Sequence, residues 1–276
     1  MVTAEYSMAD LLRVMQRLRD PKSGCPWDLE QDFHSIVPST LEECYELAQA
    51  IEHEDFDHVA EELGDVLFQV IFYSQMGQEK NLFSFDEVVS TLVDKLIRRH
   101  PHVFANGTIE GLIEGRSTVE SVKSSWEKIK QEERTSRNQT SVMSDIPLAL
   151  PALCRAQKVQ KRAAHANFDW PAVADVWEKL QEELEELHDA ISAQAPAAIN
   201  DEMGDVLFTC VNLARHLGLD AEATLRHATS KFEQRFQQME AMTDAAGTTL
   251  SSLSQAELDQ LWRQTKAEIA RRQRGL

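Results

Sequence analysis

The chain has 276 residues, which is long enough to bury one or two hydrophobic cores without metal or disulfide support. Its formal net charge of −18 argues against binding of nucleic-acid backbones or anionic membranes by general attraction, although a bound metal ion could still recruit a small anion. The few Gly (10) and Pro (8) residues disfavour a many-stranded β fold. Four dispersed cysteines, no signal-like start and no apolar run of membrane-spanning length predict a reduced, cytoplasmic protein.

Apolar residues recur at helical spacing along nearly the whole chain, and no stretch alternates as a β-strand would, so we expect an all-α fold. Ser39 and Glu42 have the spacing of a capping box, which predicts a helix start at Thr40. In chain order, the predicted helices are Met8–Leu18, Thr40–Ile51, Val59–Ser74, Phe85–Arg98, Val119–Glu133, Leu150–Arg162, Val173–Ala193, Ile199–Leu217, Ala221–Met242 and Gln255–Arg272.

The polar segment RTSRNQTSVMSD, which begins at Arg134, is rich in Ser and Thr and is typical of a linker between domains. We therefore expect an N-terminal domain at 1–135, a linker at 136–145 and a C-terminal domain at 146–276.

The two predicted domains are copies of one helical unit. When residues 41–74 are aligned with 181–214, 12 of 34 positions are identical, against roughly 2 expected from ordinary composition. Further along the chain, the offset between matching positions changes from 140 to 136 residues. Four pairs then match, namely Lys95 with Lys231, Arg99 with Arg235, Trp126 with Trp262 and Lys130 with Lys266. We call the N-terminal half copy one and the C-terminal half copy two.

Each copy carries the acidic pattern EExxE on one predicted helix and ExxD on the next. Two antiparallel helices would bring four carboxylates together, Glu43, Glu46, Glu62 and Asp65 in copy one and Glu183, Glu186, Glu202 and Asp205 in copy two. The second helix is apolar on nearly every side, which predicts that it is buried. Clustered acids then call for a hard cation, Mg²⁺ or Mn²⁺, and no Cys or His recurs in register to favour zinc. The repeated Gly64 and Gly204 predict close helix approach beside the acids.

Each motif also has a simpler interpretation. Acid-rich helices are often solvated faces with ion pairs, such as Lys179 with Glu183. Lys231 and Arg235 share a helix face that could bind phosphate oxygens or only aid solubility. Trp262, which shares a face with Lys266, could stack on a nucleobase or lie in the core. We interpret the remaining indoles, Trp27, Trp170 and Trp177, as packing residues.

The doubled acidic pattern, together with GCPWD at 24–28 and DEMGDVLFTCVNLARHLG at 201–218, resembles the MazG family of nucleoside triphosphate pyrophosphohydrolases over essentially the whole chain. The resemblance implies four-helix-bundle-like domains, a homodimer, and Mg²⁺-dependent hydrolysis of NTPs and dNTPs to the monophosphate and pyrophosphate. It implies that the four acids of copy two bind metal. It also implies nucleotide contacts from copy two, at Lys179, Glu183, Asp205, Lys231, Arg235, Trp262 and Lys266.

The resemblance further implies that copy two carries the main activity and that copy one is structural or regulatory. Copy one has Val37 where copy two has Trp177. It also has Ser39 where copy two has Lys179, so it loses a candidate phosphate contact but keeps the four acids expected to bind metal. As a hypothesis for the reaction, Glu182 accepts a proton from the attacking water while Lys231 and Arg235 stabilise the developing charge. The alternatives are a metal- or nucleotide-binding regulatory module without turnover, and a purely structural acidic scaffold.

Overall fold

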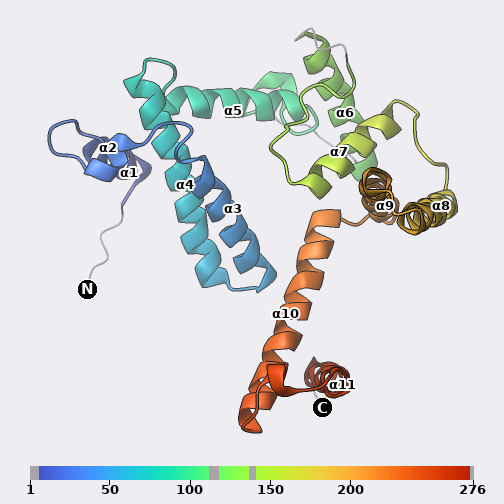
Figure 1. Cartoon of the computed structure of the whole chain (residues 1–276). Helices are drawn as coiled ribbons and strands as arrows, with labels where there is room; N and C mark the ends of the chain where they lie inside the picture. Colours follow the sequence, from blue (N-terminus) through green and yellow to red (C-terminus); the bar gives the residue numbers. More distant parts are fainter. Residues whose placement is uncertain (1–5, 112–117, 137–140, 274–276) are drawn as a thin grey trace. The chain divides into compact units, whose positions relative to one another are not determined.

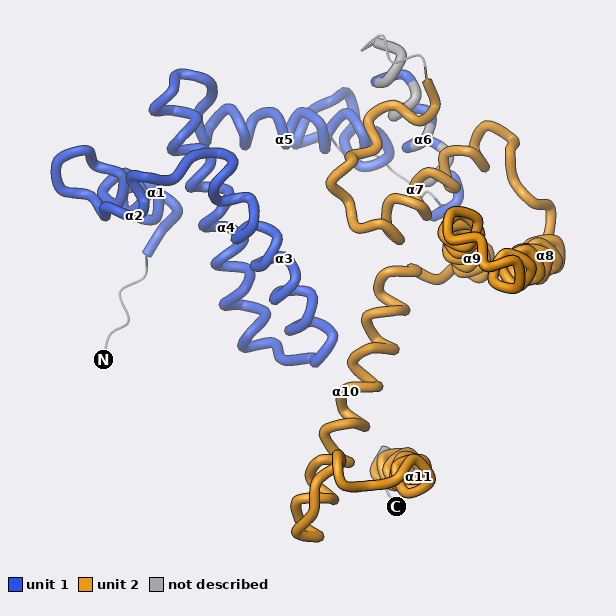
Figure 2. Tube along the Cα trace, viewed as in Figure 1, with its two compact units in different colours: residues 1–133 blue, residues 134–276 orange. Residues whose placement is uncertain are grey.

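The computed structural model describes residues 6–111, 118–136 and 141–273, except for some side chains of the sixth helix. All regular elements in these ranges are helical, which confirms the all-α prediction. The chain forms two compact units, residues 1–133 and 134–276 (Figure 2). Residues 137–140 of the predicted linker lie outside the described residues. No described helix is both long enough and apolar enough to cross a membrane.

Unit 1 is built around a pair of helices that lie side by side, α3 (Val37–Glu52) and α4 (Phe56–Glu79) (Figure 1). Two further helices pack on α4, namely α1 (Met8–Leu18) and α5 (Phe85–Arg99). The short α2 (Pro26–Glu30) and η1 (Ala105–Gly107) lie between predicted helices, and α6 (Val119–Ser136) follows. The core joins α1 to α4 through Met15, Phe72 and Met76.

The predicted start of the second helix was wrong. α3 begins at Val37, and the predicted cap Ser39 lies inside its first turn, where its side chain makes no capping hydrogen bond. Pro38 explains the earlier start, because its fixed φ suits the first helical positions and its missing N–H group costs nothing there.

Unit 2 repeats the arrangement of unit 1. Its central pair is α8 (Val173–Ser192) with α9 (Pro196–His216), and α7 (Ala152–His165) packs on α9. The long α10 (Ala221–Ala245) contacts α7, α9 and, after the short η2 (Leu250–Ser252), α11 (Gln255–Gln273). Each of the ten predicted helices therefore has a counterpart in the structure.

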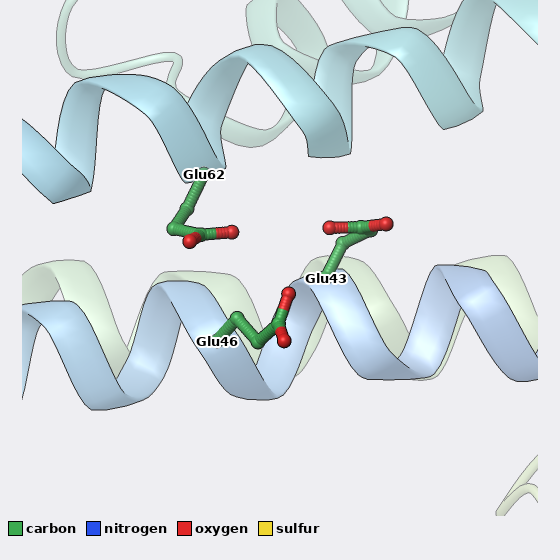
Figure 3. A group of neighbouring side chains, drawn as sticks. All are labelled: Glu43, Glu46 and Glu62. Atoms are coloured by element: carbon green, nitrogen blue, oxygen red, sulfur yellow. The ribbon is translucent and has the colours of Figure 1, made fainter.

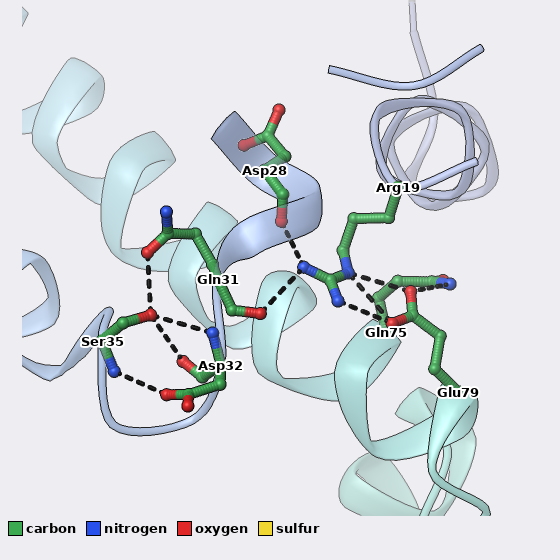
Figure 4. Close-up of polar contacts among 7 residues, drawn as sticks. All are labelled: Arg19, Asp28, Gln31, Asp32, Ser35, Gln75 and Glu79. Carbon is green, nitrogen blue, oxygen red and sulfur yellow. Dashed lines mark hydrogen bonds and ion pairs between the residues drawn. The ribbon is translucent and has the colours of Figure 1, made fainter. Parts of the chain in front are cut away.

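A buried arginine fixes the segment between α1 and α3 in unit 1 (Figure 4). Arg19 donates to the Glu79 carboxylate through Nε (2.9 Å) and Nη2 (2.7 Å), and through Nη1 to the backbone carbonyls of Asp28 and Gln31. Its guanidinium also lies over the ring of Phe72. The bidentate pair satisfies a charge that would otherwise be costly to bury, so the segment is held against α4.

The second helix of each copy is less buried than the sequence predicts. On α9, Met203, Leu207 and Phe208 stay exposed, and on α4 Leu63 and Val70 do as well. The expected close approach at Gly64 and Gly204 is also absent, since a Cβ at either position would meet no atom within 4 Å. One apolar face of each helix thus has no cover within the described part of the chain.

A candidate metal and nucleotide site

The carboxylates of copy one meet between α3 and α4 (Figure 3). Glu43 and Glu46 project from α3 toward α4, and Glu62 projects from α4 toward them, so that one oxygen from each lies within 4.8 Å of the others. Burial raises the pKa of Glu43, and the charges of Asp65, Glu46 and Glu62 raise it further. The ionised cluster is therefore strained by mutual repulsion, which a cation would relieve.

Copy two builds the same arrangement on α8 and α9. Glu183, Glu186 and Glu202 each offer an oxygen within 4.8 Å of the other two. Glu183 belongs to the buried stripe of α8, between Leu180 and Leu187, and is only 6% exposed because that stripe packs on α9. Desolvation raises the pKa of Glu186, and Glu202 and Glu183 add to this rise while Lys179 opposes it.

The fourth predicted ligand of each copy, Asp65 or Asp205, is exposed and lies outside these two groups of three. The predicted general base Glu182 also lies outside the group of copy two, with its carboxylate 2.7 Å from Lys179 Nζ. Lys179 lies 3.0 Å from Glu183 as well, and these two partners raise the pKa of its ammonium group. The ammonium group of Lys179 thus already supplies one positive charge at the edge of the acidic group.

The predicted phosphate-binding residues lie on a different part of unit 2. Lys231 is exposed on α10, and the guanidinium of Arg235 lies 5.8 Å from the ring centroid of Trp262 on α11. Phe232 packs against the same indole, and Lys266 is exposed on α11. The α8 helix packs on α9 and makes no extensive contact with α10 or α11 in the described residues. Within one chain, the structure does not bring these residues to the acids.

The side chain of Arg235 leaves a hydrogen-bond donor unused. Its buried Nε has no hydrogen-bond partner among the described residues. In copy one, the matching Arg99 and its neighbour Arg98 both bind the carboxylate of Glu133, whose pKa they lower to about 2. The register that matches Arg99 with Arg235 puts Ile269 in the place of Glu133. Copy two therefore lacks the carboxylate that neutralises the matching guanidinium in copy one. The side chain of Lys130 lies outside the described residues.

Sequence reasoning missed a cavity beside the acids. Trp170, which we interpreted as a packing residue, is exposed and borders two cavities, one of them with Lys179 and Glu182. The cause is tertiary, since Asp169 is bound by Arg215 and His216 of α9 and thereby fixes the loop that carries the indole. Trp27 and Trp177, which we also interpreted as packing residues, are about half exposed. Trp27 sits on the short α2, and Trp177 lies beside the buried stripe of α8.

The chain is similar to known proteins over nearly its whole length. The family model described as the MazG nucleotide pyrophosphohydrolase domain matches residues 31–104 and 173–239, one segment in each copy. The chain is 48% identical to the nucleoside triphosphate pyrophosphohydrolase of Escherichia coli K12, over 94% of this chain and 96% of that protein. It is 41% identical to the nucleoside triphosphate pyrophosphohydrolase/pyrophosphatase MazG of Thermotoga maritima, over 93% and 94%. The matched segments include both acidic groups, Lys231 and Arg235, and end before Trp262.

Proposed function

Because the chain belongs to the MazG nucleotide pyrophosphohydrolase family, we propose that it hydrolyses nucleoside triphosphates, both NTPs and dNTPs, to the monophosphate and pyrophosphate. The relatives from Escherichia coli and Thermotoga maritima, whose names state this activity, align over nearly their whole length, with both copies included. The geometric observation that carries the proposal is the group formed by Glu183, Glu186 and Glu202, whose oxygens converge within 4.8 Å. We assign the main activity to copy two and a cytoplasmic location to the protein.

The donor set of this group fits Mg²⁺, with Mn²⁺ as a substitute, because it offers only carboxylate oxygens. Glu183, Glu186 and Glu202 would hold the ion, with Asp205 completing the set after a change of side-chain rotamer. When bound, the ion would neutralise charge on the triphosphate and make a bound water more acidic. Glu182 would take up the proton of the attacking water, since it is exposed beside the group and can exchange Lys179 for another partner.

Lys231 and Arg235 would bind the phosphate chain, the first as a point charge and the second as a fork. The Nε donor of Arg235, which lacks a partner, supports this role. Stabilisation of charge on the leaving pyrophosphate is the main catalytic contribution expected of such residues. Trp262 supports the guanidinium from one side by its ring, at a distance typical of a cation–π contact. Lys266 would add a further positive charge beside the nucleotide.

A homodimer would complete the site. The exposed faces of α9 and α10 include Leu207 (53% exposed) and Phe232 (55%), a degree of apolar exposure that is typical of interfaces. A partner copy that covers these faces would also bring its own α10 to the acids of α8 and α9. We therefore propose that each active site takes its acids from one chain and its phosphate-binding residues from the other.

A product assay tests the reaction. The protein is incubated with each NTP and dNTP in Mg²⁺ or EDTA, and the products are separated by ion-exchange chromatography. We expect monophosphate and pyrophosphate in Mg²⁺ and neither in EDTA. Diphosphate and phosphate would show that a different bond breaks, and the absence of product from every nucleotide would favour a binding module without turnover.

Metal binding should be visible without turnover. We expect Mg²⁺ to raise the Tm, because a ligand at about 100 times its Kd stabilises the native state by about 2.7 kcal/mol. The measurement is differential scanning calorimetry across a Mg²⁺ titration at constant ionic strength, with Glu186→Gln as the test variant. In Glu186→Gln, the part of the Tm increase that comes from Mg²⁺ at copy two should be mostly lost. In the double variant Glu46→Gln/Glu186→Gln, nearly the whole Tm increase should be lost. An equal rise in wild type and double variant would contradict metal binding by these acids.

A further inference from the structure

A cavity of about 430 Å³ lies between α7, the loop that follows it and α9. The rings of Phe168, Trp170 and Phe208 line it, together with the amide side chains of Gln160 and Asn212. Trp170 is shared with the second cavity, which reaches α8. The two cavities therefore lie against the same indole, and Lys179 and Glu182 at the edge of the acidic group line the second one.

Gln160 holds its amide in one orientation. Its Nε2 donates to the backbone carbonyl of Phe208 at 2.8 Å, and only the nitrogen of the amide can do so. The oxygen Oε1 must then point elsewhere, and it is buried without a hydrogen-bond partner among the described residues. Since Gln160 is only 6% exposed, a buried acceptor is left unsatisfied in the protein alone, which is costly unless something else supplies a donor.

The side chain of Asn212 is held by its amide oxygen, whereas that of Gln160 is held by its amide nitrogen. Its Oδ1 accepts from Nε (3.1 Å) and Nη2 (2.7 Å) of Arg215, so its Nδ2 group is left as a donor with no partner in the described part of the chain. The cavity thus has one fixed acceptor and one fixed donor among aromatic rings. Every nucleobase carries donors and acceptors on its hydrogen-bonding edge, but their order differs from base to base, so one fixed acceptor and one fixed donor can distinguish among bases whose faces stack on the rings.

The repeat supplies an internal comparison. The position that matches Asn212 in copy one is Phe72, which is 1% exposed and packs in the core with Met15. At the same position of the second helix, copy one therefore has an aromatic ring in its core, whereas copy two has an amide side chain that lines a cavity. This difference follows the catalytic role that we propose for copy two.

The register on α9 also suits a nucleotide. Asp205, Phe208 and Asn212 are spaced three and four residues apart and so share a helix face. Seven residues at about 1.5 Å each separate the acid from the amide by about 10 Å along the helix axis. That span is comparable to the distance from the 5′ phosphate of a nucleotide to the far edge of its base.

We propose that this cavity receives the nucleobase of the substrate, and that Gln160 Oε1 and Asn212 Nδ2 read its edge. The inference rests on the proposed function and deepens it by naming the residues that set base preference. It assigns base selection to the cavity between α7 and α9 rather than to Trp262, which already packs against Phe232 and Arg235.

The test compares kcat/KM for ATP, GTP, CTP and UTP in the full-length wild type and three variants. Gln160→Met removes the acceptor at similar volume, and we expect the best substrate to lose about tenfold, the effect of one lost hydrogen bond, with the four values converging. Asn212→Asp keeps the bond to Arg215 but removes the donor. Guanine, which offers two neighbouring donors, should then lose least.

The matched control is Gln157→Met, one turn earlier on α7. The Gln157 amide is satisfied outside the cavity, by the Leu219 carbonyl and the Ala221 N–H group. This variant should lower the Tm at least as much as Gln160→Met, because it removes two hydrogen bonds, yet it should keep the wild-type ratios among bases. Loss of selectivity in the control would show that the ratios report only on stability, which would overturn the proposal.

A second measurement separates this inference from the proposed function. Saturation-transfer difference NMR with the four ribonucleosides in EDTA needs neither metal nor phosphate, and we expect signals from the base protons that are lost in Gln160→Met. Wild-type kinetics that treat all four bases alike, or unchanged ratios in Gln160→Met, would overturn the inference and leave the pyrophosphohydrolase proposal standing. If no nucleotide is hydrolysed but the nucleoside signal still depends on Gln160, the pyrophosphohydrolase proposal would be overturned and the base-binding cavity would stand.

Discussion

The variant Glu183→Gln should lower kcat/KM for a good NTP substrate by at least about 100-fold, the scale expected when one preorganised charged group is removed from a site. Glu183 is the most buried of the three convergent acids in copy two. Glutamine fills the same volume and keeps α8 packed on α9, but it removes one of the negative charges that would hold the proposed cation. Initial rates of pyrophosphate release across a Mg²⁺ titration give the measurement, with the Tm as a check on folding.

The matched control is Glu43→Gln, the same change at the same position of copy one. We expect its rate to stay within about twofold of wild type, as for most changes outside an active site. Copy one has Ser39 in place of Lys179, and Glu133 occupies the guanidiniums of Arg98 and Arg99. An equal loss in the two variants would contradict the assignment of catalysis to copy two, and full activity of Glu183→Gln would contradict the metal site itself.

The parts of the molecule that could be predicted from sequence depend on local spacing. Helix faces follow from apolar periodicity, and the convergence of Glu183 and Glu186 with Glu202 follows from three-residue spacing on adjacent antiparallel helices. The duplication strengthened these predictions, because a chance acidic face has no reason to recur in register with the apolar positions around it.

The parts that could not be predicted depend on contacts between residues distant in sequence. Nothing near Arg99 indicates that Glu133 will bind it, and nothing near Gln160 indicates that its amide will be held by the carbonyl of Phe208. The exposed apolar faces of α4 and α9 also could not be predicted. An apolar helix predicts that something covers it, but the pattern does not say whether the cover comes from the same chain.

If a second copy of the chain covers these apolar faces, a heterodimer of two inactive variants should regain activity. If each site takes acids from one chain and Arg235 from the other, a heterodimer of Glu183→Gln with Arg235→Ala has one site with both defects and one intact site. Two different affinity tags on co-expressed chains allow the heterodimer to be purified. We expect about half of the wild-type rate from it, because one of two symmetric sites is intact, while each variant homodimer stays nearly inactive.

A heterodimer of Glu183→Gln with Glu202→Gln is the matched control, because both defects then lie in the acidic half of the site. Each of its two sites carries one defect, whichever chain supplies Arg235, so it should remain nearly inactive. Sites completed within one chain predict no restoration in either heterodimer, and a chain that is monomeric by light scattering would exclude the shared site directly. Restoration in the first heterodimer alone would show that α10 reaches the acids of its partner, which is the arrangement that the exposed faces of α9 and α10 favour.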